Sequence, residues 1–109
     1  MATLNTFRNV TANLTTTNTS LYTCNTTLTA AIVLMSQVTN ITQTAANVTF
    51  VINNVSSSTE LVKDFMIPGN DASNVLTGKL VLQNAHSVYA SASSNSSLKI
   101  TMSVLETLI

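Results

Sequence analysis

Few side chains in this chain could take part in chemistry, and they form no known catalytic set. His86 is the single imidazole and Cys24 the single thiol among 109 residues. A nucleophile needs a base within reach, but His86 ends a turn-like segment, Gln83 to His86, with no nucleophile-elbow glycines beside it. We therefore interpret His86 as a turn histidine with a solvated ring and assign no catalytic residue.

The carboxylates do not suggest an acid and base pair either. They occur on different expected elements, at Glu60, Asp64, Asp71 and Glu106, and no motif selects two of them. One histidine and one cysteine cannot close a metal cage, and the acidic residues lie in no calcium-loop motif. With two glycines there is no phosphate-binding glycine loop. We predict no enzymatic activity, no cofactor and no metal.

Charged residues are rare in this chain, and neutral side chains carry its polarity. Charged residues make up 7% of the sequence and apolar residues 45%, and the formal net charge is zero. This balance argues against disorder, and it provides few positive charges for binding the phosphates of nucleic acid. The longest apolar run, Ala30 to Met35, is too short to span a membrane. Low charge favours packing into assemblies, and the alternative is an ordinary monomer solvated by Asn and Thr.

Eight Asn-x-Ser/Thr triplets would suggest glycosylation in a secreted protein. They begin at Asn9, Asn13, Asn18, Asn25, Asn40, Asn47, Asn54 and Asn95. With 19 Thr, 13 Asn and 13 Ser such triplets arise from composition alone. The first residues, Met1 to Tyr22, show no signal-peptide pattern, and a lone cysteine suits a reducing cytoplasm. We therefore expect synthesis in a reducing cytoplasm without glycosylation.

Period-two alternation of β-branched residues indicates half-buried strands. Asn47 to Ile52 and Leu98 to Val104 each alternate one apolar face with one more polar face. Ala30 to Met35 is apolar on both faces, as in a central strand or in a strand with one face buried in a subunit contact, and we expect it in the middle of a sheet. Other strands are expected near Asn9 to Thr16, Ser20 to Cys24, Glu60 to Ile67, Leu76 to Leu82 and Ser87 to Ser93. The pattern predicts an all-β protein, a jelly-roll-like antiparallel β-sandwich of about eight short strands.

Turn residues and the first segment complete the expected organisation. Pro68 and Gly69 fit the central positions of a type II turn, in which Gly69 adopts a positive φ. Gly78, inside a strand pattern, suggests a bulge. We expect residues 1–17 to form an N-terminal strand or arm and residues 18–109 to form the sandwich domain. The first segment would pair with a neighbouring subunit or serve as an edge strand.

The later part of the chain carries a resemblance. Pro68-Gly69 precedes Gly78-Lys79-Leu80-Val81-Leu82, then Val88-Tyr89-Ala90-Ser91-Ala92, and a closing strand, Leu98 to Glu106. This order, from about Ser20 onward, resembles small virion proteins of tailed bacteriophages, including those that infect cyanobacteria. The segment Gln83 to His86 departs from the acidic turn of similar proteins. The resemblance implies a β-sandwich that assembles on a phage particle, and it carries no catalytic residue.

We expect a non-enzymatic virion structural protein, synthesised in the host cytoplasm and located in the virion. It would assemble as a decoration or cement subunit of the head, or at the neck or tail. Its partners would be copies of itself and other virion proteins such as a capsid or tail protein, with neither nucleic acid nor membrane. Candidate interface residues are Val10, Leu14, Ile32 and Leu34. The alternative is a receptor- or carbohydrate-binding module of a tail fibre or spike, which the absence of Trp disfavours.

Overall fold

The structure is a computed structural model that describes residues 4–24, 30–76 and 78–108. Its elements are the strands β1 (Leu4–Asn13), β2 (Thr19–Thr23), β3 (Ala30–Asn40), β4 (Ala46–Asn53), β5 (Ser58–Ile67), β6 (Ala72–Asn74), β7 (Leu80–Gln83), β8 (Ser87–Ala92) and β9 (Leu98–Leu108). In the described ranges there is no helix, and so none that could cross a membrane. The predicted all-β class is confirmed.

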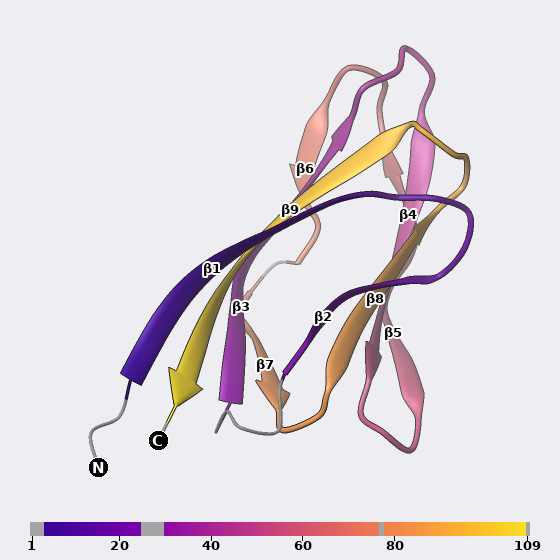
Figure 1. Ribbon diagram of the computed structural model, residues 1–109. Coiled ribbons are helices and arrows are strands. Elements are labelled where there is room, and N and C mark those ends of the chain that lie inside the picture. Colours follow the sequence, from indigo (N-terminus) through magenta and orange to yellow (C-terminus); the bar gives the residue numbers. More distant parts are fainter. Residues whose placement is uncertain (1–3, 25–29, 77, 109) are drawn as a thin grey trace.

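The strands form two antiparallel sheets that enclose one core. The first sheet has the order β1-β9-β3-β6, with β7 also paired to β3, and the second has the order β2-β8-β4-β5. In Figure 1, β1, β9 and β3 lie side by side. If β6 and β7 are taken as one interrupted strand, this alternation between sheets is that of an eight-stranded jelly roll. The predicted jelly-roll-like sandwich is therefore confirmed.

The two segments with period-two alternation, now in β9 and β4, bury the face that the sequence predicted. In β9, Leu98, Ile100, Met102 and Val104 are all buried, whereas Lys99 and Thr101 are exposed. In β4, Val48 and Phe50 are fully buried in the core, and Ala46 is buried beside them. Burial of large apolar side chains from both inner faces supplies the main driving force for packing the two sheets together.

β3 is the central strand that its apolar run predicted, because it pairs with β9 on one side and with β6 and β7 on the other. Ala31 and Val33 face the core in its first half, and Ser36 and Val38 in its second half. The register with β9 shifts between Val33 and Met35. This bulge changes which residues face inward, as one extra residue in a strand must.

The region from Ile67 to Gln83 corrects two expectations. Of the strand expected at Leu76 to Leu82, in which Thr77 lies outside the described residues, the structure shows only β7 (Leu80–Gln83), and β6 is an additional short strand before it. Gly78 lies outside both strands, so it marks no bulge. Near Pro68, the positive φ of 55° belongs to Asn70 and not to Gly69.

Gly69 is required for a different reason, a close approach of two backbone segments. A Cβ atom at this position would lie 2.2 Å from the carbonyl oxygen of Gln43. Asn70 N–H donates to the carbonyl of Thr42 at 2.8 Å in the same region. Gly69 therefore lets the β5 to β6 connection lie against the β3 to β4 loop.

Candidate assembly surfaces

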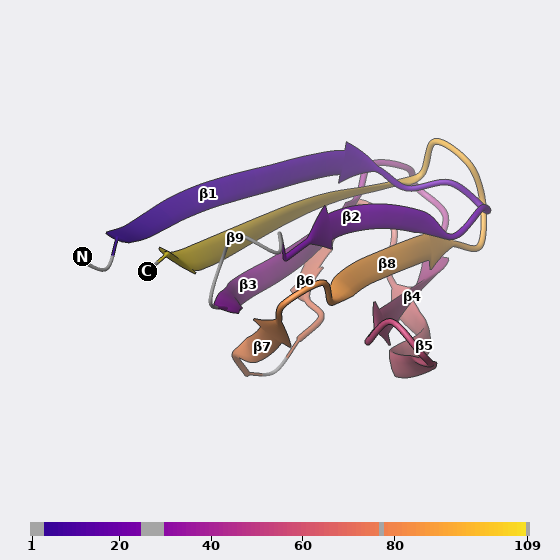
Figure 2. The same ribbon diagram turned by 60° about the horizontal axis from the view of Figure 1, so that its bottom comes forward.

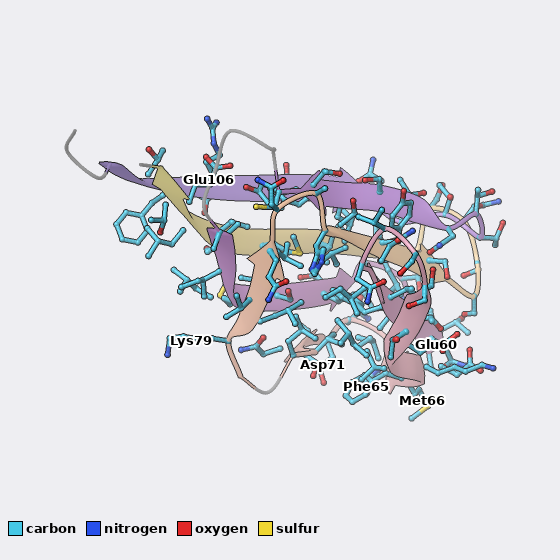
Figure 3. All side chains as sticks on the ribbon, turned by 90° about the horizontal axis from the view of Figure 1, so that it is seen from below. Glu60, Phe65, Met66, Asp71, Lys79 and Glu106 are labelled. Carbon is cyan, nitrogen blue, oxygen red and sulfur yellow. The ribbon has the colours of Figure 1, made fainter. Side chains whose placement is uncertain are left out.

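The residues with chemical potential do not meet in one site. Among the described residues no group of three or more His, Cys, Asp or Glu side chains could hold a metal ion. Figure 3 shows Glu106 on the other side of the molecule from Glu60 and Asp71. His86 lies in the turn before β8, where its N–H donates to the carbonyl of Gln83 at 3.0 Å. The candidate functional features of the described residues are therefore surfaces and not a catalytic or metal site.

One partly buried polar cluster joins the two sheets beside β1. Glu106 on β9 accepts a hydrogen bond at Oε1 from Arg8 Nε on β1, at 2.7 Å. Its Oε2 accepts a short hydrogen bond from the Tyr22 hydroxyl on β2. The Glu106 side chain is only 11% exposed. The cluster ties the edge strand β1 to its own sheet and ties that sheet to β2 of the other.

The protonation states follow from this geometry. Burial pushes the pKa of Glu106 upward, but the hydrogen bonds from Tyr22 and Arg8 outweigh it and leave the pKa below its ordinary value of 4.5. Burial and the bond to Glu106 raise the pKa of Tyr22, and burial raises the pKa of the Cys24 thiol. A carboxylate, a neutral phenol and a protonated thiol suit a structural cluster, not a nucleophile.

A row of apolar side chains crosses the outer face of the first sheet. Phe7 pairs with Leu105, Leu105 with Ile32, and Ile32 with Val81, so the row crosses β1, β9, β3 and β7. Directly paired residues of antiparallel strands point to the same face. The neighbours of these four along the strands, such as Val33 and Val104, face the core. The row therefore lies on the outside of the sandwich.

This row is open to solvent at both ends. Phe7 is 74% exposed and Val81 is 55% exposed, while Leu105 and Ile32 between them are half-buried by their neighbours. Among the described residues of this sheet that pair with a neighbouring strand and point outward, Lys99 is the single charged one. It lies toward the opposite end of β9. A continuous apolar row without charges is typical of an interaction surface.

The structure places the four predicted interface residues in different environments. Ile32 lies in the apolar row, and Leu34 lies at the bulge between Val33 and Met35. Val10 is half-buried and packs against the core from β1. Leu14 is fully buried within the chain itself. Only Ile32 and Leu34 are thus brought to the same outer region, and the interface role of all four stays a prediction.

Sequence reasoning missed Phe7, Leu105 and Val81. Phe7 precedes the strand expected at Asn9 to Thr16, and Leu105 lies just beyond the alternating segment Leu98 to Val104, although inside the closing strand that the resemblance implied. A continued period of two in each strand would have placed both on the outer face. Their meeting with Val81 depends on strand register, which a single sequence does not reveal.

A pocket of about 300 Å³ lies at the far end of the first sheet, where β1 ends and β9 begins. It is lined mainly by neutral residues, among them Asn13, Thr15, Ile41 and Asn95, with Lys99 as the charged residue. Thr16 N–H donates to Asn95 Oδ1 at 3.0 Å beside it. The lining offers no acid and base pair for catalysis.

Comparisons with known proteins identify the fold. No protein-family model matches the chain, and no curated protein matches its sequence. A chain of the Bacillus endospore appendages, which are disulfide-linked pili, aligns at 12% identity with a TM-score of 0.59, over 98% of this chain and 89% of that one. A chain of the capsid structure of Helicobacter pylori bacteriophage KHP30 aligns at 7% identity with a TM-score of 0.55, over 98% and 92%.

The infectious bursal disease virus Gx strain also contains this architecture. Its chain aligns at 9% identity with a TM-score of 0.60, and the match covers 99% of this chain but 33% of that one. Identities this low show a shared fold and nothing finer. The chain is therefore a jelly-roll sandwich of the kind found in viral particles and in a pilus.

Proposed function

We propose that this chain is a non-enzymatic structural subunit of a virus particle, and specifically of a tailed bacteriophage. The observation that carries the proposal is the exposed apolar row of Phe7, Leu105, Ile32 and Val81 on the outer face of the first sheet. The shared fold with a phage capsid chain of nearly the same extent supports it. The proposed occupant of the row is an apolar surface of another subunit.

The energetics of the row favour a contact that excludes water. Burying an apolar side chain of this size contributes about 1.5–3 kcal/mol relative to leaving it exposed. Such a contact involves no charge, which fits a chain with only four basic and four acidic residues. Copies of the chain and other virion proteins are the proposed partners. We place the subunit on the head, as a decoration or cement protein, or at the neck or tail.

The alternative of a receptor- or carbohydrate-binding module gains no support from the aromatic residues. Such modules display aromatic side chains together on one platform. Here Tyr22 is bound to Glu106 and Phe50 is fully buried. The exposed Phe7 and Phe65 belong to different sheets.

The test replaces the two exposed ends of the row. We expect Phe7→Ser combined with Val81→Ser to reduce binding to purified particles or isolated shell proteins at least about tenfold, because two apolar contacts are lost. The matched control is Met66→Ser, since Met66 on β5 is also exposed, at 60%, but lies on the other sheet. Binding is measured by co-sedimentation, and melting temperatures verify that each variant folds.

The outcomes separate the proposal from its competitors. Regular occupancy on particles, seen by electron microscopy with a fixed copy number, is the expected result. Filaments of the isolated chain would instead indicate a pilus-type subunit. A wild-type chain that binds no particle protein, or a Met66→Ser variant that loses binding as the row variant does, would contradict the proposal.

A further inference from the structure

The four sheet edges are not equally protected against pairing with another chain. β6 and β7 divide their edge into strands of three and four residues. β2 has five residues and a register shift between Ser20 and Tyr22. β5 has two register shifts and carries charged residues. Short strands, bulges and charges are the usual means by which proteins block edge pairing.

β1 uses none of these means. It has ten residues and pairs with β9 without any register shift. It contains no proline or glycine, and its single charge, Arg8, is bound to Glu106. Figure 2 shows β1 as the outermost strand of its sheet. A long, regular and almost uncharged edge is a template for a further strand.

The hydrogen-bonding pattern shows which backbone groups point outward. Leu14 N–H donates to the carbonyl of Leu98 at 2.9 Å, in continuation of the β1 to β9 register. In an antiparallel pair, residues with both backbone groups directed at the partner alternate with residues directed away from it. Even-numbered residues of β1 therefore bond to β9. The odd-numbered residues, among them Phe7, Asn9 and Thr11, present their N–H and C=O groups to the open edge.

We propose that two copies of this chain join through their β1 edges, antiparallel, about a two-fold axis at Asn9. The contact is isologous, so the same edge serves both copies. Asn9 then faces Asn9 of the other copy, and Phe7 faces Thr11. Every outward N–H between Asn5 and Asn13 gains a backbone acceptor.

The charge pattern selects this register over its neighbour. A two-fold axis at Arg8 would allow an equally long overlap and the same alternation of bonds. It would place Arg8 directly opposite Arg8, and like charges directly opposite are destabilising. With the axis at Asn9, Arg8 lies opposite Val10 and no two charges face each other. The strand is thus complementary to a second copy of itself.

This inference deepens the proposed assembly role by naming one contact within it. The contact between the two β1 strands produces a single sheet that runs through both copies. The apolar rows of the two copies then lie on the same outer face, one on each side of the axis.

The first test is a proline at the axis. Asn9→Pro removes an N–H that faces the open edge and not β9, so the fold should keep its β1 pairing. We expect the dimer dissociation constant, measured by sedimentation equilibrium, to rise at least about tenfold. Asn9→Ala is the matched control. It loses the same side-chain contact, the hydrogen bond from Ser103 Oγ to Asn9 Oδ1, but keeps the backbone donor, and we expect it to dimerise like the wild type.

The second test addresses the register. Asn9→Lys and Asn9→Asp each place like charges across the axis, so each alone should be mainly monomeric. An equimolar mixture should form heterodimers. Wild type that stays monomeric, Asn9→Pro that dimerises normally, or Lys and Asp variants that each pair with themselves would overturn the inference. Dimers without any particle binding would leave the edge contact standing and contradict only the proposed function.

Discussion

β1 and β5 are the two long outermost strands of the molecule, each of ten residues and each at the edge of a different sheet. They differ in regularity. β1 keeps one register with β9 along its whole length, whereas β5 changes register with β4 on both sides of the Phe50 pair. One sandwich therefore has an edge suited to pairing and an edge that resists it.

The irregularity of β5 has identifiable causes. Asp64 has a φ of 53°, in the left-handed region, and its N–H donates to Thr49 Oγ1 at 3.1 Å. Glu60 and Lys63 add exposed charges to the same strand. Figure 3 shows Phe65 and Met66 beyond this bulge, close together at the rim. The charges and the bulge oppose strand addition where apolar side chains are exposed.

The largest expected effect comes from disturbing the strand that supports β1. Ile100 on β9 is 1% exposed and pairs with Ala12 of β1 and Val38 of β3. Ile100→Asp buries an unpaired carboxylate, and we expect a loss of about 3–5 kcal/mol in the free energy of unfolding. Chemical denaturation followed by circular dichroism measures it.

Thr101→Asp is the control for that change, because Thr101 is exposed on the opposite face of the same strand. We expect it to cost less than about 1 kcal/mol. If the two variants unfold at the same denaturant concentration, the assignment of the inner face of β9 is wrong.

The fold was predictable where local patterns decided it. Leu98 to Val104 and Asn47 to Ile52 alternate cleanly, and each buries the predicted face. The central position of Ala30 to Met35 followed from its two apolar faces. The bulge in that strand and the division of the β6 and β7 edge were not predictable, because both depend on register with strands distant in the sequence.

The surfaces were less predictable than the fold. Arg8 and Tyr22 lie 98 and 84 positions from Glu106 in the sequence, so no local spacing signals their cluster. Ile32 was expected at an interface, but its partners in the apolar row come from three other strands. The openness of the β1 edge appears only when all four edges are compared. Sequence patterns indicate which face of a strand is buried, whereas the sheet topology determines which strands lie at the edges.

A smaller effect is expected from the cluster that anchors β1. Because the folded-state pKa of Glu106 lies below 4.5, its ionised form contributes stability fully above about pH 4.5 and loses it as the pH falls through the folded-state pKa. Glu106→Gln should cost about 1–2 kcal/mol at neutral pH. The difference from wild type should shrink in thermal melts below pH 4.5. A difference that stays constant down to pH 3 would contradict the role of the ionised carboxylate.

The smallest expected effect is that of salt, and it distinguishes the two edges directly. A contact made by β1 about Asn9 sets no charges opposite each other, and Arg8 is already bound to Glu106 within its own chain. A contact made by β5 would bring Glu60, Lys63 and Asp64 to the interface. Salt screens interactions between exposed charges and leaves backbone hydrogen bonds and apolar contacts largely intact. We therefore expect the dimer dissociation constant to change by less than about threefold between about 0.05 M and 0.5 M NaCl.

The measurement is sedimentation equilibrium of the wild type, with Glu60→Gln combined with Lys63→Gln as the matched variant. That variant should dimerise like the wild type if β1 forms the contact. A steep salt dependence that disappears in the variant would instead assign the contact to β5 and reverse the comparison.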